Sequence, residues 1–157
     1  MLATMRCWWV FPLLVACGAP APTPHFAERP RPNHPFRLVV AGDLNVALTD
    51  RDVHPKELKP GVVGQRDDER ALLRGLIGQG LVDVGRAMDP ANEGLFTWWA
   101  PWRNLRQRNI GWRIDYLLAS EALAGTATQS VVRADVGTSD HAPVVVTFGS
   151  PGPAPTG

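Results

Sequence analysis

The stretch NIGWRIDY, residues 109–116, places one carboxylate, Asp115, inside an otherwise apolar run. Ile114 and Tyr116 flank this aspartate, and residues 117–119 (Leu-Leu-Ala) continue the run. The pattern predicts a largely buried strand, in which an ionised carboxylate is unfavourable unless a partner compensates its charge. We therefore expect Asp115 to pair with another polar group of the chain.

Two further motifs place polar side chains at the ends of predicted strands. The segment GDLN, residues 42–45, follows the apolar run 38–41, and SDH, residues 139–141, precedes the apolar run 144–146. Together with Asp115, these motifs predict one polar site at one end of a sheet. Carboxylates grouped with Asn and His suit metal-assisted attack on a phosphate.

Each of these motifs also has a purely structural interpretation. Residues 42–45 are typical of a turn closed by Asx hydrogen bonds, and residues 139–141 of a capped turn. Asp115 could be held by backbone amides or by Arg113 alone. It is the occurrence of all three motifs in one chain that favours a functional site.

The composition indicates a single domain without a disulfide framework. The 157 residues allow a core of their own, and the net charge of +1 excludes a strongly basic surface over the whole molecule. Both cysteines, Cys7 and Cys17, lie close to the start of the chain. We therefore expect neither a disulfide scaffold nor a cysteine-based metal site.

Residues 1–35 are predicted to be a non-core leader, and two interpretations stay open. The apolar run 8–16 resembles the core of a signal peptide, and residues 14–17 (Leu-Val-Ala-Cys) resemble a bacterial lipobox that would place a lipid on Cys17. Alternatively, the segment is an out-of-frame remnant or follows a wrongly chosen start. The Pro- and Gly-rich tail, residues 150–157, is predicted to be disordered.

Residues 36–149 read as one mixed α/β unit. Residues 67–79 have helical periodicity, with Leu72, Leu73, Leu76 and Ile77 on one face and Asp67 or Asp68 as the N-cap. The segments 46–65 and 100–110 are long for ordinary connections and are predicted to be functional loops. The expected strands are residues 37–41, 81–84, 95–99, 112–119, 130–136 and 143–148.

A tract of tryptophan and arginine, residues 96–113, contains no acidic residue. Arginines contact phosphate oxygens, and flat indole rings stack on bases or line a sugar pocket. The tract is predicted to bind nucleic acid, the alternative being a Trp-rich edge of the core with solvated arginines.

These motifs occur together in a known family. GDLNVA, DVHPKE, DDERALL, GLVD, FTWW, NIGWRIDYLLAS and TSDHAPVVV appear in this order in the chain. They resemble the exodeoxyribonuclease III / apurinic-apyrimidinic (AP) endonuclease family of the endonuclease/exonuclease/phosphatase superfamily. The resemblance covers residues 37–148. It implies an α/β fold, a partial two-layer α/β sandwich of which this chain carries the second half only.

The resemblance also implies a role for each site residue. Asp43 would orient or deprotonate the attacking water, Asn45 would bind the scissile phosphate, and Asp115 would pair with His141, which would stabilise the transition state. Asp140 would be a ligand of Mg²⁺, for which Mn²⁺ could substitute. Three residues would line a pocket for a flipped-out abasic sugar, Trp102 would probe the minor groove, and Arg106 and Asn109 would touch the DNA backbone. The three pocket residues are Trp98, Trp112 and Ile114. The implied DNA-binding residues are together Trp98, Trp102, Arg103, Arg106, Asn109, Trp112 and Ile114.

The implied function is DNA repair. The expected reaction is Mg²⁺-dependent hydrolysis of a phosphodiester 5′ to an abasic site, with 3′–5′ exonuclease activity as a second reaction, on double-stranded DNA with abasic sites or 3′ ends. No protein partner is implied, and the expected location is cytoplasmic. The alternatives are a truncated, catalytically inactive fragment or DNA-binding remnant, and a phosphoesterase tethered to the envelope, which would involve the membrane only through a lipid on Cys17.

The first half of the implied sandwich would normally cover an apolar sheet face. Because the chain resembles only the second half, we expect that face to lack its cover and the chain alone to be marginally folded. The side chains expected on this face are Val39, Val40, Leu117, Leu118, Val144 and Val146.

Overall fold

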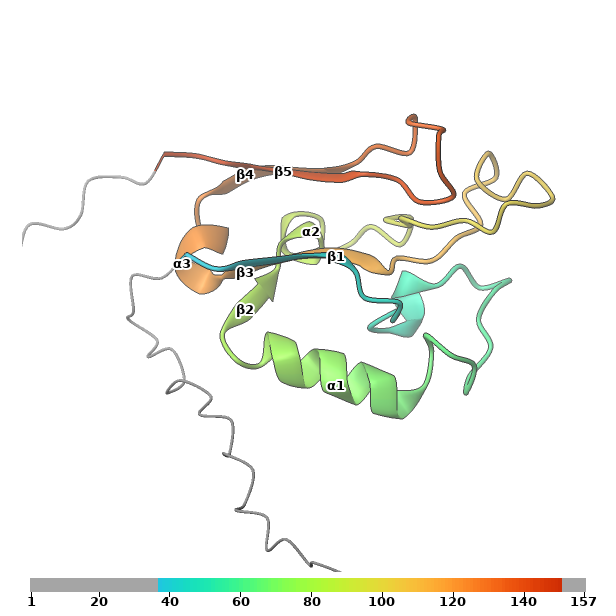
Figure 1. Cartoon of the computed structure of the whole chain (residues 1–157), viewed down its shortest axis with the longest axis horizontal. Coiled ribbons are helices and arrows are strands. Elements are labelled where there is room, and N and C mark those ends of the chain that lie inside the picture. Colours follow the sequence, from blue (N-terminus) through green and yellow to red (C-terminus); the bar gives the residue numbers. More distant parts are fainter. Residues whose placement is uncertain (1–36, 151–157) are drawn as a thin grey trace, which may run out of the picture.

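The computed structural model describes residues 37–150, so the predictions for the leader, its lipobox and residues 151–157 lie outside the described residues. Figure 1 shows an α/β arrangement in which short helices and strands alternate along the chain. In chain order, the elements are β1 (Val39–Asp43), a 3₁₀ turn (Asp50–Asp52), α1 (Asp67–Ile77), β2 (Leu81–Asp83), α2 (Val84–Met88), β3 (Asp115–Ser120), α3 (Glu121–Ala124), β4 (Ala127–Val132) and β5 (Val144–Phe148).

Two antiparallel sheets form the framework. Three strands pair in the order β1-β3-β2, and β4 pairs with β5. Helix α1 lies on one side of the three-stranded sheet and the β4–β5 pair lies on the other (Figure 1). The predicted α/β class and the partial sandwich are therefore confirmed.

Helix α1 begins one residue earlier than predicted. Its N-cap is Arg66, and the Glu69 carboxylate accepts hydrogen bonds from the backbone N–H groups of Arg66 (3.2 Å) and Gly64 (2.8 Å). The predicted N-caps, Asp67 and Asp68, are instead the first helical residues, where their negative charges favour the helix dipole. The Glu69 contacts also tie the helix to the end of the preceding loop.

The predicted apolar face of α1 divides into two. Leu73 is buried against the sheet and Ile77, one turn further on, packs with it. Leu72 and Leu76 point away from the core, and Leu72 is 78% exposed. The prediction that all four lie on one buried face was therefore wrong, because a single sheet covers only part of the helix surface.

The prediction of a strand at residues 95–99 was wrong, because these residues form no regular strand. Trp98 instead makes isolated bridges with Trp112 and His141. The strand expected from residue 112 begins only at Asp115, because the N–H of Arg113 bonds to the Asp52 carbonyl (2.7 Å) and not to a neighbouring strand. The other expected strands are present with shifted boundaries.

The face expected to lack a cover is partly covered by the chain itself. Val40 lies opposite Leu118 in the β1–β3 register, and both pack beneath α1 with Tyr116. Leu117, on the opposite face of β3, lines a small cavity of about 20 Å³ together with Val144 of β5. The six valines and leucines therefore do not share one face, because neighbouring residues of a strand point to opposite sides.

Exposed apolar side chains do remain along the strands that end the two sheets. Val39 of β1 is 41% exposed and Val145 of β5 is 47% exposed. Within residues 37–150, no helix is long and apolar enough to span a membrane.

Candidate active site at the β1 and β3 strand ends

The two predicted catalytic aspartates lie side by side. Asp43 is the last residue of β1 and Asp115 is the first residue of β3, and the antiparallel register places them opposite each other. Like charges in this position repel, so a group that can carry a proton or a positive charge between them is stabilising.

His141 supplies that group. Its Nδ1 lies 3.0 Å from Oδ2 of Asp115, and its Nε2 lies 4.0 Å from Oδ2 of Asp43. Because a carboxylate only accepts hydrogen bonds, Nδ1 carries a proton and donates it to Asp115. Nε2 is thereby left facing Asp43 and the solvent, where it can accept or release a proton.

A threonine that the sequence analysis did not single out fixes Asp115. The hydroxyl oxygen of Thr97 accepts hydrogen bonds from the backbone N–H groups of Ile114 (3.1 Å) and Asp115 (3.0 Å). Thr97 is itself buried, so this anchor is rigid. It starts β3 at the residue whose carboxylate faces His141.

Asn45 adopts the left-handed conformation, with φ of 53°. Its backbone N–H donates to Oδ1 of Asp43 (2.8 Å) and its Nδ2 donates to Oδ2 (3.1 Å). Asn tolerates this backbone conformation better than most residues, which explains its place directly after the strand. The second half of the GDLN motif thus orients the carboxylate of the first half.

Asp140 lies beside this group and is held by a tryptophan. The Trp98 indole Nε1 donates to Oδ2 of Asp140 (2.9 Å), and the Ser139 hydroxyl donates to Oδ1 (3.3 Å). The hydrogen bond from Trp98 is the main cause that lowers the pKa of Asp140 below its ordinary value. This carboxylate is therefore ionised and available to a cation at neutral pH.

A pocket of about 290 Å³ opens next to His141. Trp98 and Trp112 form its aromatic walls, with ring centroids 5.7 Å apart and an angle of 81° between the planes. The structure therefore brings together all three residues predicted to line a sugar pocket. The complete lining is Asn45, Val63, Trp98, Trp112, Ile114 and His141.

Gly111 packs closely against the backbone of Trp98, one wall of this pocket. A Cβ at this position would lie 2.5 Å from the Trp98 carbonyl oxygen and 2.5 Å from Cδ1 of the buried Trp99 ring. We expect Gly111→Ala to destabilise the fold by about 1–3 kcal/mol, as overpacking of a rigid site does.

Denaturant unfolding tests this expectation against Gly75→Ala. A Cβ on Gly75, within helix α1, meets nothing within 4 Å. The control substitution should therefore stabilise the chain by about 0.5–1 kcal/mol, because alanine loses less backbone entropy than glycine in a helix. Equal effects of the two substitutions would contradict the close approach at Gly111.

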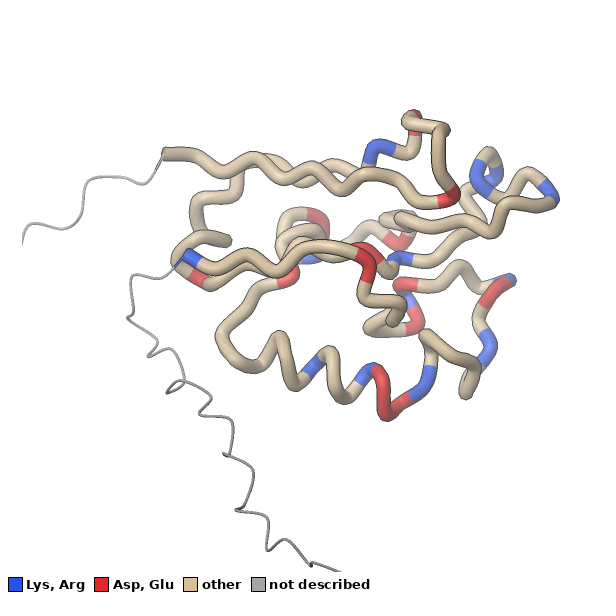
Figure 2. The backbone as a smooth tube through the Cα atoms, in the orientation of Figure 1, with Lys and Arg blue, Asp and Glu red and all other residues tan. Residues whose placement is uncertain are grey.

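The loop 100–110 carries Arg103, Arg106 and Arg108 without an acidic residue (Figure 2). Trp102 is 59% exposed on this loop, and Arg103 is exposed beside it. Asn109 is also exposed, but its side chain bonds to the protein: its Oδ1 accepts a hydrogen bond from Trp99 (3.1 Å) and its Nδ2 donates to the Gly94 carbonyl (3.2 Å). The predicted DNA contacts of these residues stay predictions.

Arg106 is also engaged within the protein. Its guanidinium donates to the carbonyl oxygens of Ala134, Val136, Ser139 and, at 3.5 Å, His141, and its Cζ lies 4.7 Å from the centroid of the Trp99 ring. Four of its five N–H donors are thus used on the segment that carries Asp140 and His141. The predicted DNA contact of Arg106 stays a prediction, whereas the structure shows it holding this segment.

A buried ionic cluster lies beneath the site. Arg113 bonds to Asp52 (2.7 Å) and to Asp83 (2.7 Å), and Arg86 bonds to Asp52 (2.8 Å). The interpretation that Arg113 holds Asp115 was therefore wrong. The motifs DVH, GLVD and GWR carry Asp52, Asp83 and Arg113, and buried charges require partners, but no local pattern indicates that these residues pair with one another.

The charges of this cluster set its pKa values. Burial would raise the pKa of Asp52, but Arg113 and Arg86 overcome this effect and hold it below the ordinary value. Burial opposes the charge of Arg113, yet Asp83 and Asp52 raise its pKa. Asp52 and Arg113 are therefore both charged, and each stabilises the charge of the other.

The described residues do not by themselves fit a complete magnesium site. Asp140 offers an ionised carboxylate that accepts hydrogen bonds from Trp98 and Ser139, whereas Asp43 and Asp115 are engaged with Asn45 and His141. Over residues 37–150, no group of three or more His, Cys, Asp or Glu side chains is placed to hold a metal ion. The prediction that Asp140 binds Mg²⁺ stays a prediction.

Residues 8–141 match the model of the endonuclease/exonuclease/phosphatase family. The exodeoxyribonuclease of Bacillus subtilis is 38% identical over 107 residues, which are 68% of this chain and 42% of that protein. The DNA repair nuclease APEX1 of Danio rerio is 33% identical over 69% of this chain and 35% of its own length.

Two solved structures that are similar to this chain are also nucleases, and it covers each of them only in part. A 3′–5′ exonuclease (NExo) from Neisseria meningitidis superimposes with a TM-score of 0.67 at 32% identity, covering 71% of this chain and 45% of that one. An AP endonuclease from Archaeoglobus fulgidus superimposes with a TM-score of 0.63 at 30% identity, with the same coverage of 71% and 45%. The chain thus spans less than half the length of these relatives.

Proposed function

The chain belongs to the endonuclease/exonuclease/phosphatase family, and we propose that it carries the catalytic centre of a DNA-repair nuclease of the exodeoxyribonuclease III type. The proposed reaction is hydrolysis of the phosphodiester 5′ to an abasic site, with removal of nucleotides from 3′ ends as a second reaction. The observation that supports it most is the Asp43–His141–Asp115 contact beside a pocket with two tryptophan walls.

Each residue of this contact has a distinct proposed task. Asp43 orients the attacking water and accepts its proton. Its carboxylate is fixed at the end of β1 because Asn45 donates hydrogen bonds to both oxygens. His141, fixed by Asp115, faces the phosphate with Nε2 and stabilises the charge that develops there. Asn45 lines the same pocket, and its amide is proposed to bind a phosphate oxygen.

The pocket accounts for the proposed choice of substrate. Its volume of about 290 Å³ and its mostly apolar walls suit a deoxyribose that has lost its base. Enzymes that act on one nucleotide turn it out of the duplex, and the energetic cost is lowest for a damaged position. The proposed cofactor is Mg²⁺, or Mn²⁺ in its place, with Asp140 as the protein ligand that this chain contributes.

The test is incision of a duplex with a single abasic site, compared with the same duplex with a normal nucleotide at that position. We expect cleavage 5′ to the abasic site only when a divalent cation is added. Cleavage that ignores the abasic site, or none by a sample with a cooperative unfolding transition, would count against the proposal.

DNA binding without turnover is the second candidate function. It is favoured by the exposure of Trp102 and Arg103 and by the incomplete metal site of the described residues. If it holds, the chain retains abasic duplex in a binding assay while the incision assay shows no product.

Binding of duplex DNA should weaken as salt is raised, because arginines displace counterions from phosphates. The double substitution Arg103→Ala and Arg108→Ala should reduce the slope of log Kd against log salt by about 2, since each contact contributes about 0.9. Fluorescence anisotropy at several salt concentrations measures this slope. Arg74→Ala, an exposed arginine on helix α1, is the matched control, and an equal loss of slope there would refute a specific role of the loop.

Arg106→Ala should act on turnover more than on DNA binding. It removes the donors that hold residues 134–141, so His141 and Asp140 lose their fixed positions. Misplacement of about 1 Å costs on the order of a hundredfold in rate. Arg106→Lys should not restore turnover, because an ammonium cannot reach several carbonyls at once.

Comparing the change in kcat with the change in the Kd for DNA separates this positioning role from direct DNA contact. A lower DNA affinity with unchanged kcat in Arg106→Ala would show instead that Arg106 binds the DNA backbone.

A further inference from the structure

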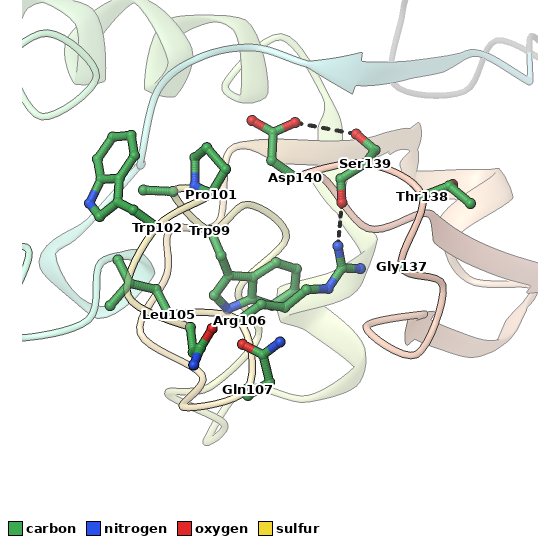
Figure 3. A pocket seen from close by; sticks show the side chains of 12 residues that line it. Trp99, Pro101, Trp102, Leu105, Arg106, Gln107, Gly137, Thr138, Ser139 and Asp140 are labelled. Carbon is green, nitrogen blue, oxygen red and sulfur yellow. Dashed lines mark hydrogen bonds between the residues drawn. The ribbon is translucent and has the colours of Figure 1, made fainter.

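A second and larger cavity lies between the loop 99–107 and the segment 137–140 (Figure 3). Its volume is about 590 Å³, roughly twice the 290 Å³ of the pocket beside His141. Trp102 and Pro101 line one side, and Thr138 and Ser139 line the other. Of the residues that line it, only Asp140 and Arg106 have a task in the proposed reaction.

The cavity adjoins the candidate active site. Asp140 lines it, and the same carboxylate accepts the hydrogen bond from Trp98, which is a wall of the smaller pocket. The two pockets therefore lie on either side of the Trp98–Asp140 contact. Under the proposed function, we expect a DNA strand with one sugar in the smaller pocket to bring a neighbouring nucleotide to the larger one.

The charges of the lining do not suit a phosphate. Arg106 is the one cation among the described residues that line the cavity, and its guanidinium is directed to the carbonyls of residues 134–141. The ligand that fits is therefore polar but uncharged.

The remaining lining suits a flat ring with hydrogen-bonding edges. The indole of Trp102 is 59% exposed, so a planar ligand can stack on it without displacing the core. Asn104 and Gln107 present amides, which both donate and accept, as base edges require. The hydroxyls of Thr138 and Ser139 add further polar groups on the opposite side.

We propose that this cavity binds a nucleobase, that of the nucleotide next to the one held in the smaller pocket. Trp102 stacks on the base, and the amides of Asn104 and Gln107 bond to its edge. The position of the base relative to the cut rests on the proposed function, whereas the chemical class of the ligand rests on the cavity alone.

Two probes test the class of ligand with the full chain. The first is deoxyadenosine, which has a base and no phosphate, and the second is 2-deoxyribose 5-phosphate, which has a phosphate and no base. Chemical-shift titration locates each probe. We expect deoxyadenosine to shift the signals of Gln107 and residues 137–139 and deoxyribose phosphate to leave these signals unchanged.

Variants then separate stacking from hydrogen bonding. Trp102→Ala should weaken deoxyadenosine binding at least about tenfold, as loss of a base-stacking ring does. Trp102→Phe keeps a ring and should stay within about threefold of the parent, which also shows that the loop is intact. Gln107→Ala should weaken binding, and Gln129→Ala, the same change on exposed strand β4, should not.

The outcomes distinguish this inference from the proposed function. Shifts caused equally by deoxyribose phosphate, or none with deoxyadenosine, overturn the nucleobase site even if the chain incises abasic DNA. Specific binding of deoxyadenosine in this cavity without any incision supports the site and counts against the nuclease.

Discussion

Arg113→Ala is expected to lower the free energy of unfolding by about 3–5 kcal/mol, because removing one partner leaves buried charges uncompensated. Side chains of Arg113 and Asp52 are 4% and 1% exposed, and both Asp52 and Asp83 depend on this arginine. Since a whole domain is stable by about 5–15 kcal/mol, this loss removes between about a fifth of the stability and all of it. Urea unfolding followed by tryptophan fluorescence measures the change.

Arg133→Ala is the matched control for this prediction. Arg133 also pairs with an aspartate, Asp135, at 2.8 Å, but both side chains are about half exposed or more (49% and 65%). Solvent screens this pair, so its loss should leave the unfolding midpoint almost unchanged. Similar losses in the two variants would mean that burial of the Arg113 cluster does not matter.

The same cluster predicts an acid limit to stability. The folded-state pKa of Asp52 lies below its ordinary value of 3.8, so the folded protein binds a proton there less readily than the unfolded chain. The resulting stability is fully present above about pH 4 and is lost as the pH falls through the lowered pKa. In Asp52→Asn, this part of the acid dependence should disappear from unfolding curves measured between about pH 5 and 2.

His141→Ala and Asp115→Asn should each reduce incision of abasic DNA at least about a hundredfold, as loss of a charge-stabilising or proton-transferring group does. Asp115→Asn keeps the size of the side chain but removes the negative charge that holds the Nδ1 proton of His141. The imidazole can then adopt the wrong tautomer. Single-turnover incision on one substrate compares the variants with the parent.

The exposed Asp135→Asn serves as the control for this pair, and thermal unfolding should show that all the variants remain folded. Because Asp115 is proposed to act through His141, the double variant should lose little more activity than either single variant. Parent-like turnover by Asp115→Asn would refute the proposed catalytic role of the Asp115–His141 pair, whatever the behaviour of the other residues.

The strand ends of the candidate site were accessible to sequence reasoning because local patterns encode them. The apolar runs next to GDLN and SDH predict where strands stop or begin, and the ends of paired strands meet. The start of β3 at Asp115 was not predicted, because the expected strand began at residue 112. The fold class followed from the same alternation of apolar runs and one periodic helix. The structure places Asp43, Asn45, Asp115 and His141 together, as these patterns predicted.

Other parts of the site were not accessible because their partners are far apart in the chain. Arg113 and Asp52 are separated by 61 residues, and Arg106 and Ser139 by 33. The local sequence pattern does not distinguish an arginine that binds DNA from one that donates hydrogen bonds to backbone carbonyl oxygens. The hydroxyl of Thr97, buried and without charge, gave no signal in the sequence either.

The sequence by itself determined which residues could react and at which strand ends they would lie, because the period of apolar residues and the position of polar ones are local properties. Only the tertiary structure decided which hydrogen-bond and packing partners each side chain has. The path of loop 100–110 directs the guanidinium of Arg106 to residues 134–141, and the packing of α1 on one side of β3 buries Leu118 there and leaves Leu117 facing the second sheet. A long side chain with several donors bonds to whichever acceptors the fold brings within reach, and that depends on the three-dimensional course of segments that no local pattern specifies.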